Sequence, residues 1–243
     1  MCLVNEKPCG EDNLYRIIGI FNNIKSSENS AGESRIKVIK NESIGLLKWN
    51  QVNDNTWSTS TLASYLNNEY YNLLNSNTKE LIDNAVWNIS KLDFINNTYT
   101  YYTNERLNSN DSSNIWIGKI GLYLPSDYGF ATGGTNRSSC LNKVLYVSSR
   151  AEFDGYYIET DECINNNWLY NGNETWFISP GTAATRVMFL YPGGYIDFGG
   201  QHGTPNVDLN VYPSFFLKSK VNILENKANG SKDNPYILEI DNE

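Results

Sequence analysis

The four cysteines are the residues with the most defined chemistry in this chain, and they fall into two pairs. Cys2 and Cys9 lie close together in sequence, while Cys140 and Cys163 form a wider pair. Four cysteines allow three pairings, and joining Cys2 to Cys9 and Cys140 to Cys163 closes the shortest loops. A zinc site is the competing assignment, but the chain has neither C-x-x-C spacing nor a histidine near the cysteines. We predict two disulfides and therefore an oxidising compartment, such as a bacterial surface, the periplasm or the extracellular medium.

The chain has a single histidine, His202, which restricts the catalytic triads that the sequence could form. It lies in the glycine-rich stretch G-G-Q-H-G-T-P, and the chain has no G-x-S-x-G motif. A serine hydrolase triad is therefore not indicated, and we expect His202 to be an exposed loop residue.

An acidic segment at 151–163 offers carboxylates for two other chemistries. Two carboxylates at a suitable separation could cleave a glycosidic bond, and roughly six to eight oxygens could hold calcium. The candidates are Glu152, Asp154, Glu159, Asp161 and Glu162. Their spacing lacks the D-x-D-x-D-G order of an EF-hand loop. We expect no cofactor, keep calcium as the open possibility and assign no metal ligands.

Aromatic residues outside the periodic segments indicate a third chemistry, the recognition of a ligand by loops. Tyrosine and asparagine together provide flat apolar faces of low side-chain entropy and adaptable hydrogen bonds. The candidates are Tyr99, Tyr101, Tyr102, Trp168, Tyr170 and Trp176. Trp176 lies within a strand pattern and is expected to be a core residue. We predict that Tyr101, Tyr102, Trp168 and Tyr170 bind the ligand.

Composition excludes several classes of function. The 243 residues carry a net charge of −8, and Lys and Arg do not cluster as nucleic-acid binding requires. Asparagine supplies 36 residues, which indicates a neutral, hydrogen-bonding surface or, alternatively, the codon bias of an AT-rich genome. The chain has no apolar run long enough to span a membrane. Its first residues lack the apolar core of a signal peptide, so we expect that any export signal has been removed.

The first elements that the sequence predicts are a hairpin and two helices. Residues 14–21 and 35–40 have strand patterns and flank a polar connection at 22–34. A first helix, capped by Ser58 or Ser60, is indicated by Leu62, Tyr65, Leu66, Tyr70 and Leu73. A second helix, capped by Asn77 or Thr78, is indicated by Leu81, Ile82, Ala85, Val86 and Ile89.

The rest of the chain is predicted to be loops and short strands. Surface loops are expected at 96–114 and 165–173, and an irregular segment at 129–139. Residues 115–124 have a strand pattern that ends at a turn signal, Pro125-Ser126-Asp127, and 144–147 could form a short strand. The stretch 176–217 predicts three strands in succession, with a tight hairpin at Gly193-Gly194, and 215–223 predicts a final strand.

Five motifs, in a fixed order that covers nearly the whole chain, suggest a relationship. They are C-x6-C followed by D-N-L-Y-R-I-I-G-I-F, then D-N-T-W-S-T-S-T-L-A-S-Y-L, I-G-L-Y-L-P-S-D-Y-G-F-A-T, W-F-I-S-P and G-S-K-D-N-P-Y-I-L. Together they resemble an uncharacterised domain family of secreted and surface proteins of gut Firmicutes, in which the domain often follows a pilin-like segment. The resemblance implies a surface-displayed protein.

The order of a helix pair, a long irregular middle and a strand triplet is also similar to the C-type-lectin-like fold, in its formylglycine-generating-enzyme-like branch. That enzyme has reactive cysteines near the end of its chain, whereas the last cysteine here is Cys163. Calcium-dependent C-type lectins use E-P-N or Q-P-D, with W-N-D further on. Thr204-Pro205-Asn206 lacks the first of these residues, and Trp49-Asn50 lacks the aspartate. The resemblance thus implies the fold without the enzyme or the calcium site.

The sequence therefore predicts one α+β domain over residues 1–243, in which 1–13 form a segment closed by the first disulfide. The expected architecture is a single C-type-lectin-like domain with two helices, a mostly antiparallel sheet and long irregular loops. The expected function is non-catalytic recognition or adhesion at the bacterial cell surface, with a glycan or a protein as the partner. The alternatives are a secreted carbohydrate-active or oxidative modifying enzyme and a structural pilus subunit.

Overall fold

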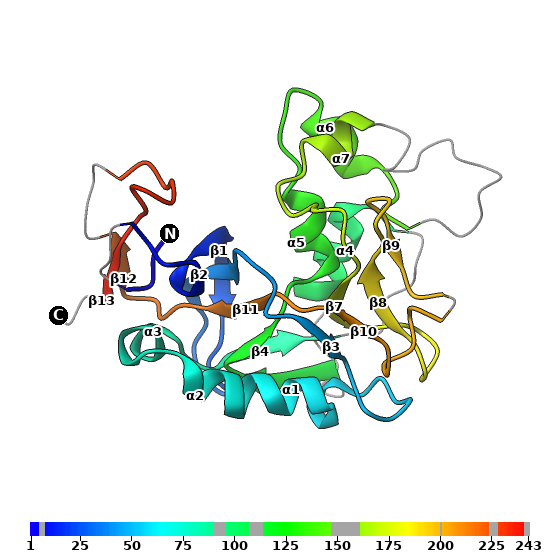
Figure 1. Cartoon of the computed structure of the whole chain (residues 1–243), viewed down its shortest axis with the longest axis horizontal. Helices are drawn as coiled ribbons and strands as arrows, with labels where there is room; N and C mark the ends of the chain where they lie inside the picture. The colour runs from blue at the N-terminus through cyan, green and yellow to red at the C-terminus, as the bar shows by residue number, and fades with distance from the viewer. Residues whose placement is uncertain are drawn as a thin grey trace.

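Two sheets form the centre of the protein, and short helices lie around them (Figure 1). The computed structural model describes residues 1–4, 8–89, 96–106, 114–146, 161–199, 201–223 and 228–240. The strands pair in antiparallel fashion with one exception among the named ladders, the parallel contact between β7 and β10. The predicted α+β class with mostly antiparallel sheets is confirmed. No helix in the described part of the chain is long and apolar enough to cross a membrane.

The first sheet has the strand order β1-β2-β11-β6. Its members are β1 (Tyr15–Ile24), β2 (Glu33–Lys40), β11 (Pro213–Phe216) and β6 (Ile120–Leu122). The expected N-terminal hairpin is present, because β1 and β2 pair with Tyr15 opposite Lys40. β2 lies between β1 and β11, and its second half is buried throughout. This places Lys37 in the interior.

The second sheet has the order β3-β10-β7-β8-β9. Its members are β3 (Leu46–Lys48), β10 (Asp208–Asn210), β7 (Thr175–Pro180), β8 (Val187–Leu190) and β9 (Ile196–Asp197). The predicted hairpin joins β8 to β9, and Gly194 adopts a φ of +81° that side-chain-bearing residues rarely tolerate. Trp176 is fully buried, as predicted, and its Nε1 donates to the carbonyl of Leu47 at 3.0 Å.

The first predicted helix is present as one continuous run from residue 61 to 73. It comprises α1 (Thr61–Tyr65), a π-helical turn η3 (Leu66–Tyr70) and α2 (Tyr71–Leu73), preceded by the 3₁₀ turn η2 (Trp57–Thr59). Ser60 caps it, because its side chain accepts from the backbone N–H of Ala63 at 3.1 Å. The second helix differs from the prediction: α3 spans only Ser76–Leu81 and is capped by Asn75. The apolar residues after it form β4 (Ala85–Asn88), which pairs with β5 (Ile115–Gly118).

The prediction of a surface loop at 96–114 is wrong for its first part, which forms helix α4 (Thr98–Arg106). The side chain of Asn97 caps it by accepting from the N–H of Thr100 at 3.0 Å. Its buried positions are Thr98, Tyr101 and Glu105. The buried stripe contains a threonine and a glutamate, so the apolar periodicity that signals a helix is missing from the sequence.

Three further helices lie where turns and irregular segments were expected, so the prediction of two helices is wrong. They are α5 (Pro125–Phe130), α6 (Arg137–Asn142) and α7 (Asp161–Asn165). Pro125 opens α5, and Asp127 accepts from the N–H of Leu124 at 2.8 Å, which satisfies a free donor at the helix start. The expected final strand is also divided: after β11 the chain forms β12 (Val221–Ile223), which pairs with β13 (Leu238–Ile240) in a separate ribbon.

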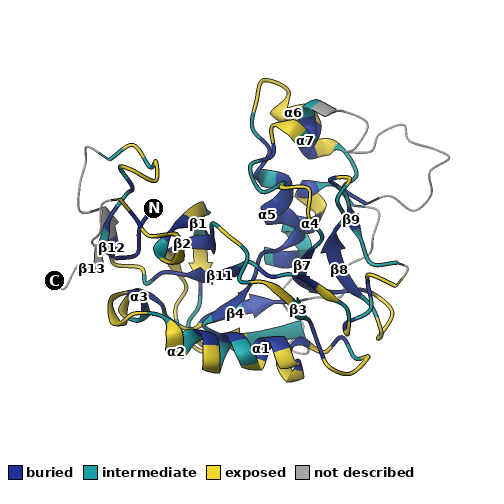
Figure 2. Ribbon diagram, viewed as in Figure 1, coloured by how far each residue is buried: buried dark blue, intermediate teal, exposed yellow. Residues whose placement is uncertain are grey.

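Both predicted disulfides are present, Cys2–Cys9 and Cys140–Cys163. The second joins α6 to α7, and its sulfur atoms lie in a buried cluster with Tyr128 and Phe177. The central strands are buried and the helices expose one face, as Figure 2 shows.

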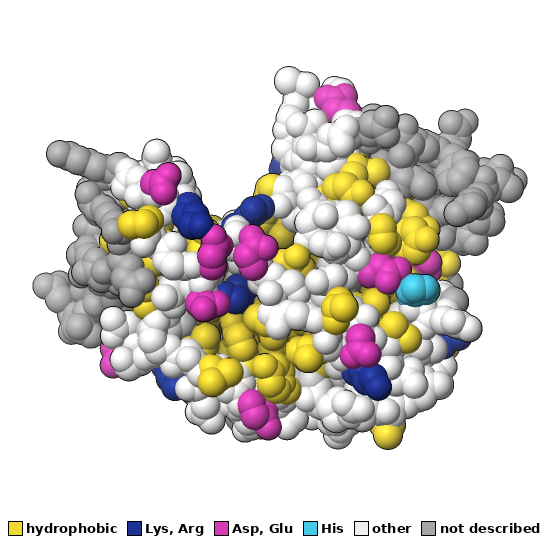
Figure 3. Space-filling model, in the orientation of Figure 1, with side chains coloured by type: hydrophobic (Ala, Val, Ile, Leu, Met, Phe, Trp, Pro, Cys, Tyr) yellow, Lys and Arg dark blue, Asp and Glu magenta, His cyan; other side chains and the backbone are white. Residues whose placement is uncertain are grey.

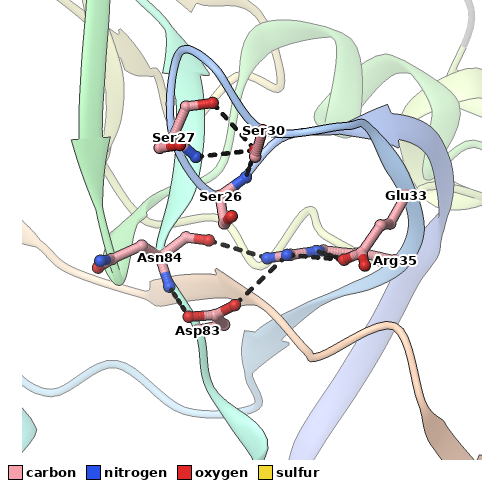
Figure 4. Close-up of polar contacts among 7 residues, drawn as sticks. All are labelled: Ser26, Ser27, Ser30, Glu33, Arg35, Asp83 and Asn84. Carbon is pink, nitrogen blue, oxygen red and sulfur yellow. Dashed lines mark hydrogen bonds and ion pairs between the residues drawn. The ribbon is translucent and has the colours of Figure 1, made fainter.

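A buried arginine connects the first sheet to the link between α3 and β4 (Figure 4). Arg35 on β2 donates from Nη1 to the carbonyl of Asn84 at 2.8 Å and from Nη2 to Glu33 Oε2 at 2.9 Å. Asp83 lies 3.4 Å from the same Nη2. Beside it, the hydroxyl of Ser30 accepts from the backbone N–H groups of two neighbouring residues and closes the β1–β2 turn.

Candidate functional site

Two adjoining hollows form a groove that we call the Arg16 groove. The hollows share Arg16, Asn41 and Glu42, and their volumes are about 520 and 190 Å³. The groove opens into the notch between the two upper ends of the molecule in Figure 3, where Lys, Arg, Asp and Glu side chains lie on the floor. It combines charged, amide and aromatic groups, which is typical of a binding site for a polar ligand.

The β1–β2 hairpin positions the residues that the two hollows share. Arg16 is the second residue of β1, and Asn41 and Glu42 directly follow β2. Arg16 pairs with Ile39, two residues before Asn41, so the Arg16 and Asn41 side chains lie diagonally on one face, and Arg16 Nε donates to Asn41 Oδ1 at 2.7 Å. Asn41 Nδ2 in turn donates to Glu42 Oε1 at 2.8 Å. This chain of hydrogen bonds fixes the exposed guanidinium against the end of the hairpin.

Trp168 and Tyr170 form the opposite wall, in the segment between α7 and β7. The Cys140–Cys163 disulfide holds α7, and Asn167 Nδ2 donates to the carbonyl of Tyr128 at 2.8 Å. Tyr170 donates its hydroxyl to the carbonyl of Pro192 at 2.5 Å. Both aromatic side chains are thus held in place while remaining half-buried.

Arg16 bridges the two walls. Its Nη1 donates to the backbone carbonyl of Trp168 at 2.7 Å, and its guanidinium carbon lies 5.8 Å from the centre of the Trp168 ring. A cation at this distance from an indole is within the range of a cation–π contact. The contact brings an arginine and a tryptophan from distant parts of the sequence into one surface.

Part of the lining of the smaller hollow is tyrosine and asparagine. Asn171 Nδ2 donates to the hydroxyl oxygen of Tyr212 at 2.6 Å, and Asn173 lines the same hollow. Burial raises the pKa of Tyr212, so its hydroxyl stays protonated at neutral pH and keeps both a donor and an acceptor. The groups here offer neutral hydrogen bonds.

The charges along the groove nearly balance. Arg16, Lys40 and Lys232 are cationic, and Glu11 and Glu42 are anionic. Lys232 forms an exposed ion pair with Glu11, and Arg16 is already engaged by neutral acceptors. The groove therefore presents mixed charge rather than the single-sign surface that binds polyanions.

Two of the four predicted binding residues line this groove and two do not. Trp168 and Tyr170 line the smaller hollow. Tyr101 is fully buried in α4 and leaves no face for a ligand, because the helix turns it toward the core. Tyr102 is half-buried, packs against Phe130 with ring centres 5.5 Å apart, and lines a different hollow with Glu105 and Arg106. The predicted placement of Tyr101 and Tyr102 on an exposed loop is therefore wrong, because both lie in α4, while a binding role for Tyr102 stays a prediction.

The sequence did not indicate Arg16, Asn41, Asn171 or Tyr212 as site residues. Arg16 lies inside an apolar strand motif, and Tyr212 precedes a buried strand. An arginine within a β-branched strand was the one available signal, since such a charge must reach solvent or a partner. The pairing that makes it functional comes from tertiary structure.

Comparisons with models of known protein families, with curated proteins and with solved structures find no match to this chain. The groove's chemistry is thus the basis for assigning a function.

The structure gives little support to the catalytic and metal-binding sites that the sequence offered. His202 is exposed, as predicted, and its Nδ1 lies 3.0 Å from Glu174 Oε2. Glu162 accepts from Asn136 Nδ2 at 2.5 Å. Glu152, Asp154, Glu159 and the side chain of Asp161 lie outside the described residues. Within the described part of the chain, no three His, Cys, Asp or Glu side chains gather as a metal site would require.

Proposed function

We propose that this chain is a non-catalytic, extracellular recognition domain that binds a neutral glycan in the Arg16 groove. The observation that supports the proposal is the fixed arrangement of Trp168 beside Arg16, with Tyr170 on the same wall of the smaller hollow. An aromatic face packs against the C–H face of a sugar ring, while fixed donors and acceptors bind its hydroxyl groups.

The lining favours a neutral glycan over the other ligand classes. Asn171, Asn173 and Tyr212 offer neutral donors and acceptors in the lining of the smaller hollow, where they would bind sugar hydroxyl groups. A polyanion would meet Glu11 and Glu42, and like charges across an interface cost binding energy. A protein ligand is the alternative, because tyrosine and tryptophan are also frequent in protein interfaces.

The proposal extends to architecture and location. A single C-type-lectin-like domain on the surface of a bacterial, pilin-like protein would present such a groove to host or bacterial glycans. The two disulfides support an oxidising, extracellular location. This fold assignment is ours and is an analogy of architecture, so it adds no residue to the site.

A structural pilus subunit is the alternative for which the structure offers a specific feature. β1 is an edge strand of the first sheet and exposes Ile17 at 38% and Ile20 at 72%. An edge of this kind could pair with a strand of another copy. Its pairing with β2 is irregular at 17–19 and at 21–24, and such bulges discourage edge-to-edge addition. This favours recognition over polymerisation.

A glycan array, run with and without calcium, tests the proposed function. The wild-type chain should bind a defined set of neutral glycans, and Trp168→Ala should lose at least about 2 kcal/mol of binding free energy, as truncation of a central aromatic typically does. Tyr99→Ala is the matched control, because Tyr99 is 45% exposed on α4 and lies outside the groove lining. Its binding should equal that of the wild type.

Three outcomes would contradict the proposal. Equal loss in Trp168→Ala and Tyr99→Ala would place the site elsewhere. Binding that requires calcium would point to a lectin site of another kind, and release of shortened glycan products would indicate an enzyme.

A further inference from the structure

Four charged side chains gather inside the protein, away from the Arg16 groove. They are Lys37 on β2, Glu105 and Arg106 on α4, and Asp127 on α5. Lys37 has no exposed surface, and Glu105 and Asp127 each expose 2%. Ionised groups are costly to bury even as pairs. A cluster of this kind therefore needs an explanation beyond stability.

Lys37 and Asp127 are in direct contact. Lys37 Nζ lies within hydrogen-bonding distance of Asp127 Oδ2, and the Leu124 N–H donates to the same oxygen at 2.8 Å. The aromatic rings of Trp87 and Phe216 enclose the amine, with their centres 4.9 and 5.6 Å from Nζ. The reacting partners of an amide bond, an amine and a carboxyl group, are thus held together in a buried environment beside aromatic rings.

Glu105 lies next to this pair. Both of its carboxyl oxygens are 3.3 Å from the backbone nitrogen of Ser126, the residue before Asp127. Burial raises the pKa of Glu105 to about 8, and burial lowers the pKa of Lys37 to about 8. Near neutral pH the site therefore holds a carboxylic acid and, in a fraction of molecules, an uncharged amine.

We propose that Lys37 and Asp127 become joined by an intramolecular amide bond, with Glu105 as the proton carrier for the reaction. The Lys37 ammonium first passes one proton to Oδ2 of Asp127, its hydrogen-bond partner, which leaves an uncharged amine beside a carboxylic acid. The lone pair of Lys37 Nζ then attacks Cγ of Asp127 and forms the new C–N bond. The bond from Cγ to Oδ2 breaks, and Oδ2 leaves as water with two protons, the one received from the ammonium and one from Glu105. Glu105 donates one proton to the departing oxygen and recovers one from Nζ, so it ends as it began. No electrons are transferred and no co-reactant is consumed.

Arg106 is placed to stabilise the intermediate. Its Nη2 lies 3.8 Å from Asp127 Oδ1, and neither atom has a hydrogen-bond partner among the described residues. Negative charge would develop on this oxygen when the amine attacks, and a positioned guanidinium favours that charge. The product is a neutral amide, so two buried charges disappear from the interior. The bond would tie β2 to α5 across the intervening strands β11 and β6.

The mass of the full chain, denatured and reduced, tests this proposal without any variant. The wild-type chain should be lighter than its sequence by one water molecule. Trypsin should fail to cut after Lys37, because that amine is acylated, and should release a branched peptide that joins residues 36–40 to residues 120–137. A mass equal to that of the full sequence would overturn the proposal. A lost water without the branched peptide would also overturn it.

Substitutions separate the roles of the two reacting residues from that of the proton carrier. Lys37→Arg and Asp127→Ala should each regain the full sequence mass. Glu105→Gln keeps both reacting residues and should also regain it, whereas the exposed Glu80→Gln control should stay one water lighter. A lost water and a branched peptide in Glu105→Gln would overturn the role of Glu105 as proton carrier.

Discussion

Arg16 donates a hydrogen bond of 2.7 Å to the carbonyl of Trp168, which lies 152 residues later in the chain. The same guanidinium lies 5.8 Å from the centre of the indole ring. One side chain therefore both positions the aromatic wall of the groove and presents its own donors to the groove. If the groove binds a glycan, this contact should decide both affinity and selectivity.

Replacing Arg16 with alanine should weaken ligand binding while changing stability little. Arg16 is exposed, so its removal leaves no buried group unsatisfied, and surface substitutions of this kind usually change stability by about 0.5 kcal/mol or less. The dissociation constant should rise by roughly tenfold, which corresponds to about 1.4 kcal/mol. Titration calorimetry with an array hit measures the first quantity and thermal unfolding the second.

Arg16→Lys is the sharper comparison. It keeps the charge but loses the planar fork that contacts Asn41 and Trp168 at once. An affinity close to that of the Arg16→Ala variant would show that the planar geometry of the guanidinium, rather than its charge, supports binding. Affinity close to that of wild type would show that charge alone matters and would contradict the role given to the fork.

Removing the Cys140–Cys163 disulfide should lower both stability and affinity. The bond joins residues 23 apart, and a loop of that length corresponds to about 3 kcal/mol of stabilisation in the chain-entropy account. It also holds α7, from which the chain runs to Trp168. Denaturant unfolding and glycan binding of the Cys140→Ser/Cys163→Ser double variant measure the two effects.

The matched comparison is Cys2→Ser/Cys9→Ser. Its bond joins residues only 7 apart, so the entropic contribution should be smaller. An equal or larger loss of stability in this variant would contradict the loop-length argument.

The parts of the fold that could be predicted are those in which local pattern and final environment agree. The β1–β2 hairpin, the Ser60 cap, the Gly193-Gly194 hairpin and both disulfides follow from residue type and spacing. Helix α4 could not be predicted, because its buried face includes Glu105 and its aromatic Tyr101 sits among polar neighbours. The stripe after Leu81 fits a helix and a strand equally, and pairing with β5 selects the strand.

The residues of the candidate site also divide into those that the sequence predicts and those that it does not. Trp168 and Tyr170 were predicted because they lie in a loop without periodicity, and they line the groove. Arg16 and Tyr212 come from strand motifs, and their place in the groove depends on how β1 meets the segment after α7. The sequence pattern identifies aromatic residues that do not fit a core. It does not show that the end of an apolar strand reaches the surface and contributes a residue to a groove.

Arg35→Ala should destabilise the fold. Arg35 is 4% exposed and joins β2 to the α3–β4 link through Asn84 and Asp83 (Figure 4). Hydrogen bonds to charged groups typically contribute about 1.5–3 kcal/mol, and the carbonyl of Asn84 would lose its donor. Denaturant unfolding should therefore show a loss of about 2 kcal/mol or more.

Arg186→Ala provides the control for Arg35, because Arg186 Nη1 donates only to the carbonyl of its neighbour Thr185 at 3.1 Å among the described contacts. Its unfolding free energy should stay within about 0.5 kcal/mol of wild type. A similar loss in both variants would mean that the contacts of Arg35 are not the cause.

Stability should fall at high pH because of Tyr15. Burial raises the pKa of Tyr15 from 10.0 to about 12, and its hydroxyl lies 3.3 Å from that of Tyr70. Between these two values the folded state keeps the proton and the unfolded state releases it. The unfolded state then binds fewer protons, so the free energy of unfolding decreases as pH rises, by about 1.4 kcal/mol per pH unit from this group. The contribution is fully present below pH 10 and is lost progressively toward pH 12.

Tyr15→Phe isolates this effect, because phenylalanine keeps the buried ring, including its edge contact with Phe215 at 5.2 Å, and removes the titrating hydroxyl. Urea unfolding of both proteins at about pH 8, 10 and 11 measures the slope. Wild type should lose more stability than the variant between the two higher values, and the two should have parallel profiles below about pH 9. Parallel profiles over the whole range would mean that Tyr15 ionises equally in the folded and unfolded states, which its burial at 1% exposure argues against.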